Sequence, residues 1–100
     1  MTTQRYIVRA NKGRARIWLE GKRLTAAGFA VGARFSPEVI EGALVLRLDA
    51  SGSRRVSGKG ERPIIDISGG SCDPFVTGDA AQVNYIAQHS IVITGAHDDA

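Results

Sequence analysis

Cysteine and histidine are scarce in this chain of 100 residues. Its one cysteine, Cys72, cannot form an internal disulfide, and its only histidines, His89 and His97, do not combine with it in the spacing of a structural zinc site. Neither histidine belongs to an evident acid–base pair. We therefore expect no disulfide framework, no bound metal, no cofactor and no catalytic residue.

Long apolar stretches are also missing. The first ten residues carry two arginines and no apolar run, and no segment approaches the roughly 20 apolar residues of a membrane-spanning helix. We therefore expect no signal peptide and no membrane partner, and a protein that is soluble in the cytoplasm.

Positive charge is absent after Arg62. All 13 lysines and arginines lie between Arg5 and Arg62, beside five acidic residues, so this segment carries 13 − 5 = +8. From Pro63 onward five aspartates, including Asp98 and Asp99, give −5, which restores the total of +3. Such segregation favours a polyanionic partner such as nucleic acid, unless folding interleaves the two segments and neutralises the field.

The remaining composition fits one globular domain spanning residues 1–100. Hydrophobic residues make up 43% and charged residues 23%, while 12 glycines favour many turns over long helices. A chain of this length buries about two-thirds of its unfolded surface, which is enough for a single core.

The chain contains a degenerate internal repeat, with one copy over about residues 5–48 and a second over about 53–94. Residues 49–52 join the copies and have the composition of a linker. A shift of 46 to 48 positions aligns Val8 with Val56, Asn11 with Lys59, Arg14 with Arg62, Ile17 with Ile65, Leu19 with Ile67, Phe29 with Phe75, and Leu44-Val45-Leu46 with Ile91-Val92-Ile93.

The residue pattern of each copy predicts two strands, then a short helix, then two further strands. In the first copy we expect the strands over residues 5–10, 14–19, 33–40 and 44–48, and the helix over residues 22–27. Pro37 argues for an edge or a bulge in the third of these strands. A unit of about 44 residues cannot bury both sides of its sheet, so the copies must share a core. We expect a mostly β fold, closed into one barrel with internal pseudo-twofold symmetry and one short helix per copy.

The strand over residues 14–19 separates apolar from basic side chains. Because side chains alternate between the two faces of a strand, Ala15, Ile17 and Leu19 share one face, which we expect in the core. The opposite face then carries two arginines and Trp18. This tryptophan either stacks on an exposed base or covers the edge of the core.

The first copy resembles a known family. Residues 17–32 read I-x-L-x-G-x-x-L-x-x-A-G-F-x-x-G, and residues 39–46 read V-x-x-G-x-L-V-L, a pattern similar to that of the SymE toxin-like group of the AbrB/MazE superfamily. The second copy keeps a weaker form of it, with Ile65, Gly69, Phe75 and Gly78. The resemblance implies a swapped-hairpin β-barrel, a pseudo-dimer in which this one chain supplies both halves.

The same resemblance implies DNA binding through basic residues on the early strands and loops. Only residues 95–100 follow the last expected strand, whereas AbrB-type antitoxins commonly carry a C-terminal tail that grips a toxin. We therefore expect a DNA-binding transcriptional regulator that is a monomeric pseudo-dimer or a homodimer, with duplex DNA as partner and RNA as the alternative. Two other functions stay open: a SymE-like toxin that cleaves RNA, and a protein-interaction module.

The candidate nucleic-acid-binding residues are the cations of the two early hairpins. Arginine can contact phosphates or guanine edges, and Gly13, Gly58 and Gly60 would let backbone amides approach a phosphate. Each cation has a plainer explanation as part of a solvated surface. The set comprises Lys12, Arg14 and Arg16 in the first copy and Arg54, Arg55, Lys59 and Arg62 in the second, with Lys22 and Arg23 as secondary candidates because the second copy has no cation at either position.

Overall fold

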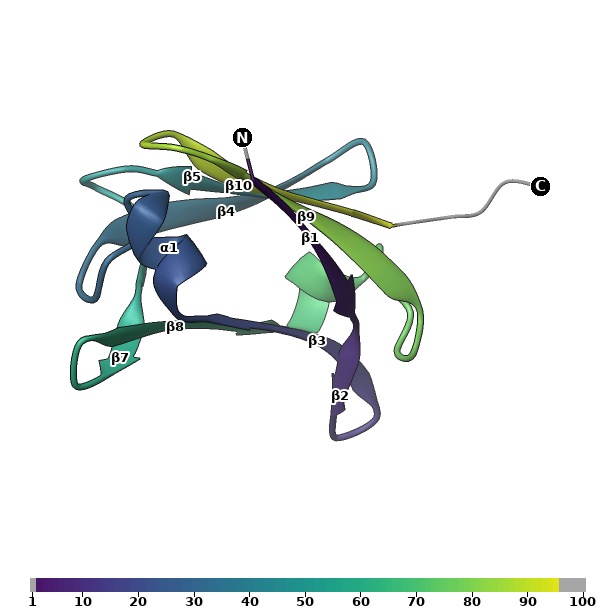
Figure 1. The fold of residues 1–100 in the computed structure, drawn as a ribbon. Helices are drawn as coiled ribbons and strands as arrows, with labels where there is room; N and C mark the ends of the chain where they lie inside the picture. The colour runs from purple at the N-terminus through teal and green to yellow at the C-terminus, as the bar shows by residue number, and fades with distance from the viewer. Residues whose placement is uncertain (1, 96–100) are drawn as a thin grey trace.

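The two copies carry the same series of elements. The computed structural model describes residues 2–95 (Figure 1), so His97, Asp98 and Asp99 lie outside the described residues. The first copy forms β1 (Thr2–Ile7), β2 (Arg9–Asn11), β3 (Arg14–Glu20), α1 (Lys22–Ala26), β4 (Arg34–Ile40) and β5 (Ala43–Leu48). The second forms β6 (Arg54–Arg55), β7 (Ser57–Lys59), β8 (Arg62–Ser68), the 3-10 helix η1 (Gly69–Cys72), β9 (Ala80–Ile86) and β10 (Ser90–Gly95).

The expected strands form, but the first one is divided. The chain leaves β1 at the buried Val8 and enters β2, which belongs to another sheet. The Val8 N–H donates to the Asp79 carbonyl at 3.0 Å, and its carbonyl accepts from Gly78 at 2.9 Å. In the second copy Val56 lies between β6 and β7 and makes the same two bonds, with Ala33 and Gly32. The repeat therefore marks the point where each copy crosses between sheets.

The short helix of the first copy is also confirmed, whereas the second copy has a 3-10 helix in its place. α1 contains Lys, Arg, Leu, Thr and Ala, while η1 contains Gly, Gly, Ser and Cys. Glycine and serine are poorer helix formers than most of the α1 residues, so the second copy closes only a short, tight turn.

All strand pairs are antiparallel and form two sheets. The six-stranded sheet has the order β1-β9-β10-β5-β4-β6, and the four-stranded sheet has the order β2-β3-β8-β7. Both sheets are open, where we expected one closed barrel. Among the described residues the six-stranded sheet ends in β1 and β6, which the chain leaves at Val8 and Val56, and the four-stranded sheet ends in β2 and β7, which the chain then enters. Pro37 lies at an edge, as expected, because β6 pairs only with Arg34 and Phe35 of β4.

Four pairings join one copy to the other: β1 with β9, β5 with β10, β4 with β6, and β3 with β8. In β3–β8, Trp18 is opposite Asp66, and these positions are also equivalent under the 48-residue shift. In β5–β10, Val45 is opposite Val92, which is its own counterpart in the repeat. We call β3–β8 and β5–β10 the central pairs; in each of them, the register between the strands is symmetric about the midpoint.

The core lies between the sheets and contains the apolar faces expected from alternation. Ile17, Leu19, Ile65 and Ile67 are buried on the inner face of the four-stranded sheet. The facing sheet contributes further fully buried side chains, which are Leu44, Leu46, Ile91 and Ile93. Cys72 is buried in the same cluster, where it packs as a small apolar residue, and its Sγ lies 3.2 Å from the Ile67 carbonyl oxygen. No helix among the described residues is long and apolar enough to cross a membrane.

Tyr6 links the edge of the six-stranded sheet to the middle of the four-stranded sheet. Its hydroxyl oxygen accepts a hydrogen bond of 2.8 Å from the backbone N–H of Trp18. β2 ends its pairing with β3 at Arg16, so on this side of β3 the Tyr6 hydroxyl takes the place of a strand at Trp18. Burial raises the pKa of Tyr6, which keeps the phenol neutral.

Replacing Tyr6 with Phe should lower the free energy of unfolding by about 1–3 kcal/mol, because the Trp18 N–H would lose its partner. Tyr85→Phe is the matched control, since the Tyr85 hydroxyl donates to a side chain, Gln4, that can reorient after the substitution. Urea denaturation of both variants measures the difference. An equal or smaller loss for Tyr6→Phe would contradict the structural role of this bond.

Separated copies should not fold alone, because the central pairs of both sheets join one copy to the other. Chains that end at Asp49 or begin at Ala50 should be unfolded or should associate with another copy. Circular dichroism and sedimentation of each half provide the test. A stable, monomeric half would contradict the shared core.

Candidate nucleic-acid interface

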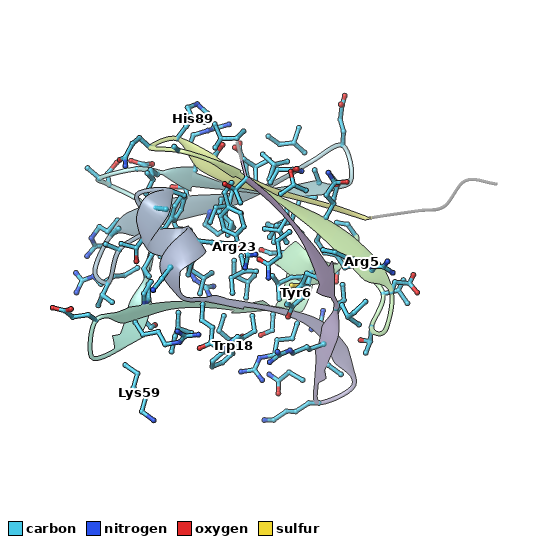
Figure 2. All side chains as sticks on the ribbon, viewed as in Figure 1. Arg5, Tyr6, Trp18, Arg23, Lys59 and His89 are labelled. Carbon is cyan, nitrogen blue, oxygen red and sulfur yellow. The ribbon has the colours of Figure 1, made fainter. Side chains whose placement is uncertain are left out.

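The outer surface of the four-stranded sheet gathers most of the candidate cations. Burial of the inner residues places Arg14, Arg16 and Trp18 of β3 outside, and the register adds residues of β2, β8 and β7 to the same side. Trp18 and Lys59 extend away from the six-stranded sheet (Figure 2). We call this surface the basic face; its outward residues are Arg9, Asn11, Arg14, Arg16, Trp18, Glu20, Ser57, Lys59, Arg62, Ile64, Asp66 and Ser68.

Two hairpins project from opposite ends of the basic face. The β2–β3 hairpin points away from the six-stranded sheet, and the β7–β8 hairpin extends to the left along β8, with β7 on the side of β8 that is farther from that sheet (Figure 1). Lys12 and Gly13 turn the first with positive φ angles of 53° and 79°, and Gly60 turns the second with a φ of 64°. Arg14 and Arg62 stand at the bases of these turns.

The register sets the distance between the hairpins. Arg16 pairs with Ser68 at one end of the β3–β8 pair, and Glu20 pairs with Ile64 four positions further along. Arg14 lies two positions beyond the first of these pairs, and Arg62 lies two positions beyond the second, so eight strand positions separate the two arginines. Eight strand positions correspond to roughly 25 Å along the sheet. The two hairpins can therefore contact parts of a ligand that lie this far apart.

The hairpin arginines form exposed ion pairs. Arg14 Nη2 lies 3.4 Å from Asp73 Oδ1, and both side chains are more than 60% exposed. Arg62 Nε lies 3.2 Å from Glu20 Oε2, and these side chains are 57% and 39% exposed. Exposed pairs of this kind contribute about 0–1 kcal/mol, so a phosphate can compete with the carboxylate.

A tighter cluster occupies the middle of the face. Arg16 Nε and Nη2 each donate a hydrogen bond of 2.8 Å to one carboxylate oxygen of Asp66. The Arg16 Cζ lies 4.7 Å from the ring centroid of Trp18. The Arg16 hydrogen bonds lower the pKa of Asp66, and those bonds also raise the pKa of Arg16. Both groups are therefore charged at neutral pH.

The remaining candidates divide between this face and other surfaces. Arg54 reaches it from β6, and its Nη2 donates to the Asp66 carbonyl at 2.9 Å. Arg55, the next residue, points to the opposite side of its strand and lies beside Arg34 on the six-stranded sheet. Lys22 borders the face, since it lines a depression of about 220 Å³ together with Arg62.

Arg23 lies away from the basic face. It lines a depression of about 270 Å³ with Lys22 and Tyr85, between α1 and β9. Burial raises the pKa of Tyr85 to about 12, and the nearby Arg23 counteracts part of this increase. The structure therefore brings together Lys12, Arg14, Arg16, Arg54, Lys59 and Arg62, with Lys22 at the margin and Arg23 and Arg55 elsewhere.

Arg9 belongs to the basic face although the sequence analysis did not assign it a role. It lies on β2 directly opposite Arg16, and cross-strand partners project to the same side of a sheet. The turn at Lys12 and Gly13 fixes this register. Counting back from that turn would have placed Arg9 on the face.

The charge segregation of the sequence is only partly retained in the fold. Folding interleaves the two segments in part, the alternative that the sequence left open, because Asp66 and Asp73 pair with Arg16 and Arg14. Antiparallel pairing of β8 with β3 brings Asp66 onto the face, and η1 carries the chain on to Asp73. Counting the hairpin turns and Arg54, seven cations (Arg9, Lys12, Arg14, Arg16, Arg54, Lys59, Arg62) face four acids (Glu20, Glu61, Asp66, Asp73), so an excess of positive charge remains.

The three glycines expected near a phosphate have different roles. Gly13 and Gly60 lie in open turns, with no atom within 4 Å of where a Cβ would be. A Cβ on Gly58 would instead lie 2.4 Å from the Val31 side chain. Gly58 is therefore required for packing, and only the two turn glycines leave backbone accessible.

No family model matches this chain, and comparisons with curated proteins and with solved structures find no match. Within residues 2–95, no three His, Cys, Asp or Glu side chains gather where they could hold a metal ion. His89 lies in the turn between β9 and β10, with its Nδ1 2.8 Å from the Ser90 hydroxyl oxygen.

The Arg16–Asp66 pair should make stability depend on pH. Because the folded pKa of Asp66 is below its ordinary value of 3.8, the pair stabilises the fold above that pH and loses its effect as the pH falls through the lower, folded pKa. A double-mutant cycle of Arg16→Gln and Asp66→Asn should give a coupling of up to about 1 kcal/mol at pH 7, since the pair is partly exposed. Thermal unfolding of the wild type and the three variants between pH 7 and pH 2 should show the coupling decrease as the pH falls. A coupling that does not change over this range would contradict the ion pair as its source.

Proposed function

We propose that this protein binds duplex DNA through the basic face and acts as a transcriptional regulator. The observation that carries the proposal is the pair of basic hairpins at the two ends of the β3–β8 strand pair, both on the side of the molecule that is farther from the six-stranded sheet (Figure 1). Lys12 and Arg14 belong to one hairpin, and Lys59 and Arg62 to the other. Cations spaced along one surface match a polyanion that extends across it.

The shape of the four-stranded sheet favours a duplex over a single strand. β2 pairs with residues 14–16 of β3 and β7 with residues 62–64 of β8, so the middle of the sheet is only two strands wide. A two-stranded ribbon fits the major groove of B-DNA, which is about 12 Å wide. Hairpins at its two ends would then contact the phosphates that border the groove.

The sequence resemblance supports the same function. We further propose that the two copies arose by duplication and correspond to the halves of a swapped-hairpin dimer of the AbrB/MazE type. Support comes from the equal lengths and equivalent positions of β3 and β8, of β4 and β9, and of β5 and β10. In such an assembly Arg14 and Arg62 are equivalent phosphate contacts.

Binding should depend strongly on salt, and the two hairpin arginines should account for part of that dependence. Each phosphate contact contributes about −0.9 to the slope of log affinity against log salt concentration, so Arg14→Gln with Arg62→Gln should make the slope shallower by about two. Fluorescence anisotropy with a 24-bp duplex of random sequence between 50 and 200 mM salt measures it. Arg47→Gln is the matched control, because Arg47 forms a similar exposed ion pair with Glu38 on the six-stranded sheet.

The same assay separates the alternatives. Single-stranded RNA, followed by gel electrophoresis for integrity, tests the ribonuclease function that the SymE resemblance implies. Cleavage that is lost on a single acidic or histidine substitution would favour the toxin. Absence of binding to duplex DNA, single-stranded DNA and RNA would leave the protein-interaction module as the better account. Because Arg47→Gln removes one charge instead of two, a slope shallower by about one in this control would show that total charge, not the basic face, controls binding.

A further inference from the structure

The middle of the basic face differs chemically from its ends. The hairpins carry Lys12, Arg14, Lys59 and Arg62, whose acidic partners, where they have one, are exposed and weakly held. The middle carries Asp66, whose carboxylate is held by two short bonds from Arg16. A phosphate placed over Asp66 would meet an ionised carboxylate at close range, and this repulsion offsets part of its attraction to the nearby Arg9, Arg16 and Arg54. The middle of the face is therefore a poorer site for the DNA backbone than the hairpins.

The same cluster suits the edges of bases. An Asp carboxylate can accept from the N4 amino group of cytosine, and an Arg guanidinium can donate to O6 and N7 of guanine. Arg16 uses Nε and one N–H of Nη2 on Asp66, so both Nη1 hydrogens and the second Nη2 hydrogen remain available. One G·C pair offers the complementary set of acceptors and donor in the major groove.

Trp18 and Asp66 also hold the guanidinium in place. The indole ring lies under Arg16 at 4.7 Å, and the two-bond contact with Asp66 fixes the guanidinium orientation. A side chain that is already ordered loses less conformational entropy on binding and discriminates more sharply between base edges. No comparable cluster is present at either hairpin, whose arginines are each held by a single bond to a carboxylate.

We infer that Arg16 and Asp66 select the DNA sequence by reading base edges in the major groove, whereas the hairpins bind phosphates without selecting sequence. This inference rests on the proposed function. It assigns the middle of the face a preference for a G·C base pair. It also divides the basic residues into two classes: substitution of Arg16 should change sequence preference, whereas substitution of a hairpin cation should change affinity for all duplexes alike.

The repeat adds a second consequence. Arg14 and Arg62 are equivalent, but Arg16 corresponds to Ile64 in the second copy, and Trp18 corresponds to Asp66. The proposed phosphate contacts are thus nearly symmetric between the two copies, whereas the proposed base contacts, Arg16 and Asp66, have no equivalents related by the repeat. The preferred sequence should therefore be non-palindromic, unlike the site of a symmetric homodimer.

Selection from a duplex library with 12 randomised base pairs tests the inference with the full chain. The wild-type protein should enrich a non-palindromic sequence with a required G·C pair, and exchange of that pair should weaken binding roughly 5- to 150-fold. Asp66→Asn and, separately, Arg16→Lys should lose most of this discrimination while still binding duplex DNA. Asp66→Asn keeps an acceptor for Arg16, and Arg16→Lys provides a second variant if the first does not fold.

Asp73→Asn is the matched control, because it frees Arg14 in a hairpin. It should strengthen binding to all duplexes alike and leave the enriched sequence unchanged. Trp18 is the only tryptophan, so its fluorescence should change when the preferred duplex binds.

The outcomes separate this inference from the proposed function. Failure of the wild-type protein to bind any duplex would overturn the proposed function itself. Binding without enrichment, a palindromic preference, or an enriched sequence that both Asp66→Asn and Arg16→Lys retain would overturn the inference alone. Unchanged Trp18 fluorescence on binding would place the DNA elsewhere and would also overturn the inference.

Discussion

The antiparallel pairing of β3 with β8 is the interaction on which the rest of the structure depends. It joins the two copies of the repeat and buries Ile17 and Leu19 beside Ile67 and Ile65. Burial of apolar surface of this kind is the main favourable contribution to folding, and this pairing draws it from both copies. The pairing of β5 with β10 completes the opposite sheet, so the two central pairs enclose one core.

The same pairing decides what the outer surface can contain. Because side chains alternate along a strand, the residues between the buried isoleucines and leucines must project outward. On β3 these residues are mostly basic, and on β8 they include Asp66. The register that aligns the core therefore also sets Arg16 against Asp66, and it places the two hairpins at opposite ends of the face.

The fold combines a symmetric framework with asymmetric chemistry. Val8 and Val56 make equivalent crossings, and β3 and β8 have equivalent positions, yet the helix after β3 becomes a 3-10 turn after β8. In the middle of the basic face, equivalent positions of the two copies carry different residues, such as Trp18 and Asp66. At the ends of the face, equivalent positions carry the same residue, arginine, at Arg14 and Arg62. Core positions tolerate little change in volume, while exposed positions can diverge at small cost in stability.

The sequence by itself determined the mostly β class and the alternation of β3, because these depend on local patterns of apolar and polar residues. Tertiary structure alone decided that Asp66 and Asp73 lie against Arg16 and Arg14, and that the sheets stay open. It also decided that the Tyr6 hydroxyl accepts from the Trp18 N–H. Contacts between residues 50 or more positions apart depend on the register between strands of different copies, which is fixed only when both copies pack their apolar faces into one core.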